Sequence, residues 1–189
     1  CYNSYEISIN KRNQMSELNA GPHAPDVVNV VIEIKKGERN KYEMDKETGY
    51  LTLDRVTPVA MGYPTDYGFV PNTLCEDGDP LDALLVIDES VPHSVVVPSR
   101  PIGVLHMVDG GEDDEKLICV PADDITQEWL NDVHQLGDNF KKKIEHYYSH
   151  YKDWKKDWNG AEVSFKGWGG ADEARQVIQN SIHRFNDAE

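Results

Sequence analysis

The chain has 189 residues, and its 34 Asp and Glu outnumber its 19 Lys and Arg to give a formal net charge of −15. This length fits one domain with its own core, and the negative charge disfavours nucleic acid or an anionic membrane as the main partner. The sequence has no apolar run of about 18 residues and no signal-peptide core, which predicts no membrane span and no export.

Three cysteines, none of them in a CxxC pair, favour free thiols and a reducing, cytoplasmic location. Residues 1–26 show neither helical nor strand periodicity, so we expect a disordered N-terminal extension there. Residues 1–14 precede Met15 and are either an added, non-native segment or a native extension. Residues 27–189 are expected to form a single domain.

Short strand candidates dominate the chain from residue 27 onward. β-Branched and alternating segments, separated by glycines and prolines, predict strands at residues 27–34, 41–44, 50–53, 83–87, 94–97, 102–108 and 117–120. Apolar residues at three- and four-residue spacing then predict helices within residues 129–152 and 171–185. We therefore expect a mainly β fold with flanking helices, of the α+β class, in which a small barrel lies beside two principal helices.

The segment CEDGDPLDALLV, residues 75–86, places Asp77, Asp79 and Asp82 within six positions. A helix-loop-helix calcium site would need Gly at its sixth position and Glu at its twelfth, where this chain has Asp82 and Asp88. A solvated acidic turn is one remaining interpretation. The other is a hard-metal site, because Mg²⁺ would offset the repulsion among three carboxylates.

A second acidic segment, MVDGGEDDEKL, lies between two strand candidates and supplies Asp109, Asp113 and Asp114, with Lys116 just beyond. On its own it would be read as a solvated hairpin. Two acidic loops that bound strands of one small barrel can, however, face each other across its mouth and hold several metal ions. Two metals that bridge a water produce a strong nucleophile and bind a phosphate.

Cations and phenols occur at expected strand and helix ends. Each one alone is more often a surface charge or a core aromatic. Together they suit a polyphosphate, because Arg offers a planar fork, Lys a point charge and Tyr a neutral donor. The set comprises Lys41, Arg55, Tyr63, Tyr67, Tyr151 and Lys152.

Six segments of the chain form an ordered series: VVIEIKKGERNKYEMDKETG, LDR, YPTDYGFVPNTL, EDGDPLDALLV, RPIGVLHMVDGGEDDEKLICVP and IEHYYSHYKDW. In this order they resemble the motifs of family I soluble inorganic pyrophosphatases of the bacterial type. The resemblance runs from about residue 27 to the C-terminus. It implies an OB-like five-stranded barrel, a homohexamer, and hydrolysis of pyrophosphate to two phosphates by a metal-bridged water. The implied cofactor is several Mg²⁺ ions per site, with Mn²⁺ or Zn²⁺ as substitutes.

The resemblance also implies a role for each matching residue. Asp77, Asp82 and Asp114 bind the first metal, and Asp82 is shared with the second. Asp109 and Asp114 hold a metal that arrives with the substrate. Glu33 and Glu43 act near the metals, partly through water. The phosphates are bound by Lys41, Arg55, Tyr67, Lys116, Tyr151 and Lys152. The proton acceptor is Asp79 or Asp114, and a carboxylate saturated by metals is a poor base, which favours Asp79.

Two departures from the family pattern stand out. Gly110 occupies the position after Asp109 where many bacterial members have an acidic residue, with Glu112 as a candidate substitute. The segment WKKDWNGAEV replaces a short Gly-containing turn and leaves the register of the last strand open.

Other functions were weighed against this one. His146 and His150 have the spacing of two zinc ligands, but a zincin needs Glu where Tyr147 stands, so core or subunit-contact histidines are favoured. A nucleic-acid-binding OB module would want a basic groove, which the acidic loops contradict. An inactive, assembly-only homologue stays open.

Overall fold

The computed structural model describes residues 18–155 and 162–188. Within these ranges, no helix combines the length and the apolar character that crossing a membrane requires.

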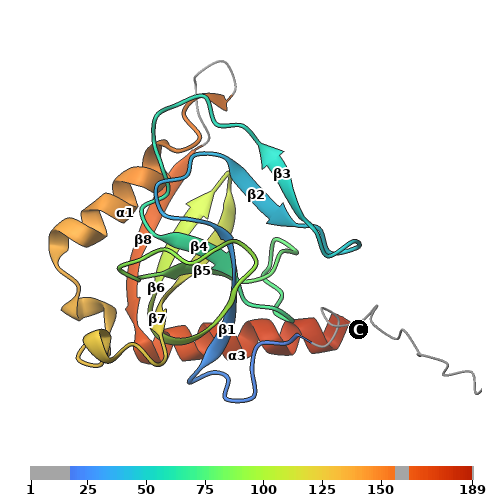
Figure 1. Ribbon diagram of the computed structural model, residues 1–189, viewed down its shortest axis with the longest axis vertical. Helices are drawn as coiled ribbons and strands as arrows, with labels where there is room; N and C mark the ends of the chain where they lie inside the picture. Colours follow the sequence, from blue (N-terminus) through green and yellow to red (C-terminus); the bar gives the residue numbers. More distant parts are fainter. Residues whose placement is uncertain (1–17, 156–161, 189) are drawn as a thin grey trace, which may run out of the picture.

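Five strands close into a ring, which Figure 1 shows at the centre of the molecule. In ring order they are β1 (Val28–Ile34), β4 (Asp66–Phe69), β5 (Asp82–Leu85), β7 (Glu112–Pro121) and β6 (Val96–Asp109), and β6 pairs back with β1. The β5–β7 pair is parallel and the other pairs are antiparallel. The OB-like five-stranded barrel is confirmed.

The strand β6 joins two strands that were expected to be separate, at residues 94–97 and 102–108. Its first part, Val96–Ser99, pairs with β1, whereas Gly103–Asp109 pairs with β8 (Val163–Gly170) outside the ring. The prediction of two strands was wrong because Pro98 and Pro101 were taken as breaks. The pairing with β7 instead shifts register just after Pro101, and such irregularities are places where a strand tolerates proline.

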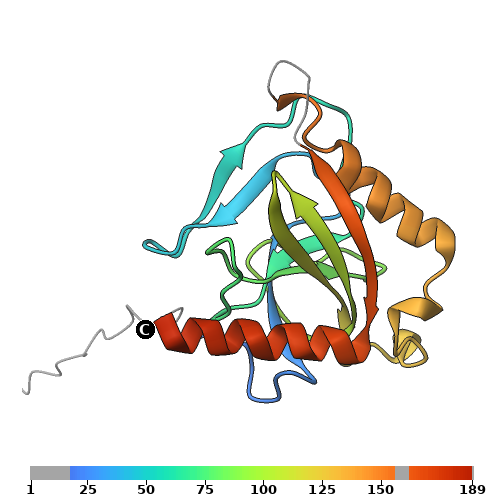
Figure 2. The ribbon, with the colours of Figure 1, turned by 180° about the vertical axis from the view of Figure 1, so that it is seen from behind.

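The ring is covered on two sides, as Figures 1 and 2 show. Alternate residues of β5 and β7 enter two apolar clusters, one containing Leu84 and Ile118 and the other Ala83 and Leu117. The first cluster includes buried residues of α1 (Asp138–His150), and the second includes those of α3 (Ala171–Ala188). Burial on both faces explains why these strands read as continuous apolar runs.

The helix expected within residues 129–152 begins only at Asp138. The preceding residues form two short 3₁₀ turns, η1 (Ile125–Gln127) and η2 (Val133–Gln135). Asp132 caps η2 by accepting the backbone N–H of His134 at 2.9 Å, so its side chain stabilises a turn instead of a longer helix. The second expected helix is confirmed as α3.

The strands β2 (Lys41–Met44) and β3 (Leu51–Arg55) form a separate two-stranded hairpin that stands away from the ring (Figure 1). The strand expected at residues 50–53 is therefore displaced toward Arg55. The structure also adds β4, which the sequence analysis did not predict because Asp66 and Gly68 are poor strand formers.

Part of the N-terminal segment contacts the ring. The carbonyl oxygen of Ala20 accepts the backbone N–H of Asn29 at 2.8 Å, and Ala20 is buried. The disordered extension expected over residues 1–26 therefore does not include Ala20. The alternatives weighed for residues 1–14 fall outside the described residues, and the assignment of 27–189 to one domain stays a prediction.

We predict that Gly68→Ala strongly destabilises the protein. A Cβ atom at Gly68 would lie 1.8 Å from the carbonyl oxygen of Val31, so β4 could not stay paired with β1. A backbone clash of this kind should cost about 3 kcal/mol or more of unfolding free energy. The matched control is Gly137→Ala, where nothing lies within 4 Å of the added atom. Equal urea midpoints for the two variants would contradict the prediction.

Candidate active site

One cavity of about 1030 Å³ collects the residues that the sequence analysis selected. Its wall combines the β2–β3 hairpin, residues 71–80, strands of the ring, and the ends of α1 and α3. Every expected site residue except Asp109 lines it, namely Glu33, Lys41, Glu43, Arg55, Tyr67, Asp77, Asp79, Asp82, Asp114, Lys116, Tyr151 and Lys152.

Residues 70–81, called the acid loop below, are closed at their base by hydrogen bonds. The Val70 N–H donates to the carbonyl oxygen of Leu81 at 2.9 Å. The buried hydroxyl of Thr73 donates to the Val70 carbonyl oxygen at 2.6 Å and accepts the Leu81 N–H at 2.8 Å. The base is thus held by groups that have no contact with water, and the tip is left to carry the carboxylates.

The tip of the acid loop is a tight turn. The Cys75 N–H donates to the carbonyl oxygen of Asp79 at 2.8 Å, and Gly78 has a φ of +88°, which glycine adopts without strain. Asp77 and Asp79 are exposed at this tip. Asp82 follows at the start of β5, so the chain places three carboxylates along one side of the cavity.

A buried lysine lies between two of the expected metal-binding carboxylates. The Nζ atom of Lys116 donates to Asp82 at 2.7 Å and to Asp114 at 2.9 Å. This follows from the strands, because Lys116 is opposite Asp82 in the parallel β5–β7 pair and shares one face of β7 with Asp114. Burial opposes the charge, but the two carboxylates outweigh it and raise the pKa of Lys116 well above its usual value.

Glu33 is a buried carboxyl group on β1. Burial raises its pKa to about 8, and the nearby Asp82 and Glu43 carboxylates add to the rise. Its one described hydrogen bond, accepted from the Met44 N–H at 2.7 Å, acts in the opposite direction. The group is therefore largely protonated at neutral pH, and a cation placed beside it would favour the ionised form.

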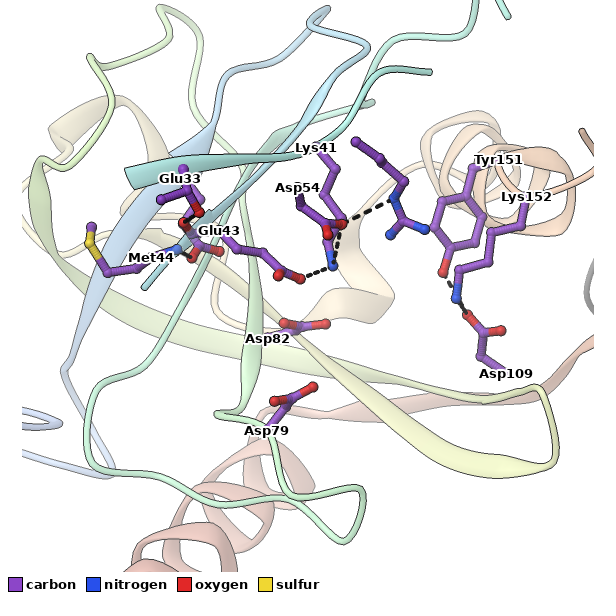
Figure 3. A network of polar contacts seen from close by, with 12 residues as sticks. Glu33, Lys41, Glu43, Met44, Asp54, Asp79, Asp82, Asp109, Tyr151 and Lys152 are labelled. Atoms are coloured by element: carbon purple, nitrogen blue, oxygen red, sulfur yellow. Dashed lines mark hydrogen bonds and ion pairs between the residues drawn. The ribbon is translucent and has the colours of Figure 1, made fainter. Parts of the chain in front are cut away.

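At the other end of the cavity wall, Tyr151 and Lys152 converge on Asp109 (Figure 3). The Tyr151 hydroxyl donates to Asp109 at 2.6 Å, and Lys152 pairs with the same oxygen. Burial alone would raise the pKa of Asp109, but these two hydrogen bonds outweigh it and lower the pKa. Tyr151 is the C-cap residue of α1, so the end of the helix sets the position of its phenol.

The hairpin brings its cations to the cavity together with acidic partners. Lys41 pairs with Glu43 and lies 3.6 Å from Asp54, which is also 3.4 Å from Arg55 (Figure 3). The β2–β3 register places Lys41 opposite Arg55, so both project from the same end of the hairpin. Asp54 links the two and was not selected from the sequence, although its place beside Arg55 in LDR was a signal.

Lys46, at the hairpin turn, is a second lining residue that was not selected from the sequence. Its Nζ atom lies 3.2 Å from Asp79, so it joins the hairpin to the tip of the acid loop. Both side chains are largely exposed, and such a pair contributes little to stability. The sequence gives no signal for it, because the two residues are far apart in the chain.

The carboxylates do not form a ready-made metal centre. In the parts of the chain that the structure describes, no three His, Cys, Asp or Glu side chains converge with metal-binding geometry. Asp82, Asp114 and Asp109 are instead paired with lysines. The donor set is nevertheless of one chemical kind, since the acidic wall offers carboxylate oxygens and no histidine is among the described lining residues. Such donors fit Mg²⁺ or Mn²⁺ better than Zn²⁺.

The departure at Gly110 has a local explanation. Gly110 and Gly111 have φ values of +65° and +95° and form the two-residue turn between β6 and β7. Both positions of such a turn favour glycine. Glu112 is the backbone partner of Asp109 across the turn. Its role as a substitute for the acidic residue missing at Gly110 stays a prediction. The register of β8 is now defined, with Gly170 opposite Gly103 and Val163 opposite Asp109.

We predict that Glu33→Gln changes the pH dependence of stability in the chelator-treated protein. Because folding raises the pKa of Glu33 from 4.5 to about 8, the wild type loses stability as the pH rises through this window. The loss should be of the order of 3 kcal/mol, since each pKa unit corresponds to about 1.4 kcal/mol. Glutamine does not titrate and can keep the bond from Met44. Urea midpoints at pH 5.5 and 8.5 should therefore differ less in the variant, and an unchanged pH dependence would contradict the assignment.

Comparison with known proteins gives one consistent result. The family model described as "Inorganic pyrophosphatase" matches residues 30–186. The chain is 48% identical over 158 residues to the inorganic pyrophosphatase of Corynebacterium efficiens, covering 84% of this chain and 98% of the relative. It is 42% identical over 173 residues to that of Xylella fastidiosa, covering 90% and 96%.

Solved structures agree with the sequence relatives. The crystal structure of inorganic pyrophosphatase from Thermus thermophilus superposes with a TM-score of 0.85 at 39% identity, and covers 89% of this chain and 97% of that one. The resemblance drawn from the motifs is confirmed, and the chain belongs to the inorganic pyrophosphatase family.

Proposed function

We propose that the protein hydrolyses pyrophosphate to two phosphates in a reaction that depends on Mg²⁺. One observation carries the proposal: a single cavity is lined both by clustered carboxylates and by lysine, arginine and tyrosine side chains. The first set suits hard cations and the second suits phosphate oxygens. Family membership supports the same reaction.

The residues that would hold the metal ions are Asp77, Asp82, Asp109 and Asp114, with Glu33 and Glu43 close by and partly acting through water. Bound divalent cations supply Lewis-acid activation of water and neutralise charge on the phosphates. Burial is the main cause of the raised pKa of Glu33, with Asp82 and Glu43 adding to it, and a bound cation would favour its ionised form. Mn²⁺ is a chemically suitable substitute, and Zn²⁺ is a poorer match to carboxylate oxygens.

The phosphates would be bound by Lys41, Arg55, Tyr67, Lys116, Tyr151 and Lys152. Tyr151 and Lys152 donate to Asp109 in this structure, so their donors are already directed to the edge of the cavity. Substrate oxygens can replace that carboxylate as acceptors. Burial raises the pKa of Tyr67 and Tyr151 above their usual values, which keeps both phenols protonated as donors.

Asp79 is the better candidate for the proton acceptor. Its side chain is exposed and has Lys46 as its one described charged partner, whereas Asp114 is mostly buried and bonded to Lys116. An acceptor must have an oxygen free to approach water, and Asp79 meets this condition. Asp114 remains the alternative.

We predict that Asp82→Asn lowers the rate of phosphate release at saturating Mg²⁺ by roughly a thousandfold or more, because each ~1.4 kcal/mol of lost transition-state stabilisation is tenfold in rate. The matched control is Asp88→Asn, which removes the same charge from the exposed end of the same apolar run. It should change the rate less than about threefold. Chelation of metal should abolish wild-type release.

Circular dichroism would first establish that both variants are folded. If the folded Asp82→Asn variant kept most of the wild-type rate, the metal-assisted reaction would be contradicted. An inactive wild type, in the presence of Mg²⁺, would favour the assembly-only homologue.

We also propose a homohexamer in a reducing, cytoplasmic location. Ile125 and Trp129 are large apolar side chains left exposed just ahead of α1, which supports burial against another subunit. On α1, His146 and His150 lie with ring centroids 4.7 Å apart on exposed positions. Cys75 and Cys119 are free thiols in the described part of the chain, which supports the location.

We predict that assembly responds to mild acid. Histidine is the side chain whose charge most readily changes between pH 5 and 8, so a subunit contact that contains these two would respond to mild acid. Light scattering across this range should report a hexamer and a shift in its subunit equilibrium. A monomeric mass at every pH would refute the assembly.

A further inference from the structure

The C-terminal half of α3 contacts the acid loop through backbone and side-chain hydrogen bonds. The Leu74 N–H donates to the carbonyl oxygen of Ser181 at 2.9 Å. Arg184 donates through Nη1 to the Leu74 carbonyl oxygen at 3.2 Å and through Nη2 to the Glu76 carboxylate at 3.3 Å. Both polar groups of the Leu74 backbone are therefore bonded to one helix, just ahead of Asp77.

The helix is a fixed support for these bonds. Ala174, Val177, Ile178 and Ser181 of α3 are buried, and the three apolar ones join the cluster that fills one side of the ring. Arg184 lies about one turn beyond Ser181, near the C-terminal end of α3, whose Phe185 and Ala188 line the cavity. The Arg184 guanidinium group therefore links the buried helix to the acid loop.

The acid loop needs such a support. It carries Glu76, Asp77 and Asp79, whose charges repel one another. Thr73 holds the base of the loop, and two cations pair with carboxylates of its tip: Lys46 with Asp79 and Arg184 with Glu76. Arg184 bonds the Leu74 carbonyl oxygen, just before the tip, and the Glu76 carboxylate, which is not an expected metal ligand.

We propose that Arg184 is a positioning residue that holds the acid loop in the conformation in which Asp77 receives a divalent cation. The inference rests on the proposed function, since it takes this loop to be part of the metal site. It assigns to α3 a role in cation affinity that is separate from its packing on the ring.

The proposal and its simplest alternative predict opposite changes in cation affinity when Arg184 is replaced. If Arg184 acted only as a nearby positive charge, its removal would strengthen the attraction of the acid loop for cations. If Arg184 positions the loop, its removal weakens cation binding, because ordering the carboxylates then costs conformational entropy at the moment of binding. Groups that orient metal ligands through hydrogen bonds typically change affinity by about 10–100-fold.

The test is a calorimetric titration of the metal-stripped full chain with Mn²⁺, without pyrophosphate. Arg184→Met removes the fork and the charge, and should bind Mn²⁺ about tenfold more weakly than wild type, at the lower end of that range. Arg184→Lys keeps the charge but cannot make both bonds in the same fork geometry, so it should fall between the two.

The matched control is Arg175→Met. Arg175 lies on the same helix, is about as exposed as Arg184, and pairs with Asp26 and Asp172 instead of the acid loop. Its Mn²⁺ affinity should equal that of wild type. Thermal unfolding of the metal-free proteins should give similar midpoints for both methionine variants. If Arg184→Met does not fold, Arg184→Lys decides the question alone, since it changes no charge.

Unchanged or tighter Mn²⁺ binding in the Arg184 variants overturns the inference, and so does an equal loss in Arg175→Met. Phosphate release from pyrophosphate, measured on the same samples, separates this result from the proposed function. An active wild type whose Arg184 variants bind Mn²⁺ normally refutes only the positioning role. A wild type that binds Mn²⁺ without hydrolysing pyrophosphate refutes only the reaction.

Discussion

The buried ammonium of Lys116 is the charge around which the rest of the site is arranged. It lies between Asp82 and Asp114, and the rings of Tyr67 and Tyr148 lie 5.8 and 5.2 Å from it. Removing one carboxylate from such a group costs far more than the net value of the pair, since it leaves charge uncompensated in a poorly solvated place. The parallel pairing of β5 with β7 is therefore what brings two acidic motifs, separated in the sequence, into one site.

The closed ring makes that pairing rigid. β6 completes the ring with β1 in its first part and extends beyond it in its second part, where it ends at Asp109. One continuous strand thus fixes the distance between the ring and the end of α1, where Tyr151 and Lys152 contact Asp109. The β2–β3 hairpin forms a separate sheet and supplies Lys41 and Arg55, so the lining cations come from two supports, the hairpin and the end of α1.

Local chemistry could be predicted from the sequence, and long-range pairing could not. β-Branched runs predicted β1 and part of β7, and the spacing of Asp77, Asp79 and Asp82 predicted an acidic turn, because both depend on neighbours in the chain. The contact of Arg184 with the acid loop spans more than 100 residues and leaves no local pattern. Asp66, which the sequence analysis did not select, is also placed by long-range contacts: its buried carboxylate accepts hydrogen bonds from the Lys36 and Val91 N–H groups and from the Ser90 hydroxyl, and so joins separate loops.

The charges that line the cavity also offset a conflict between the negative net charge of the molecule and the anionic substrate proposed for its site. A chain of net charge −15 repels an anionic substrate at long range, and salt screens this field beyond about 8–10 Å. Inside the cavity the balance is local, because Lys41, Arg55 and Lys152 line it together with the carboxylates of the acid loop. Divalent cations held by the acid loop would change the local charge there from negative to positive. Binding of cations and of phosphate should then strengthen each other, because each neutralises the charge that opposes the other.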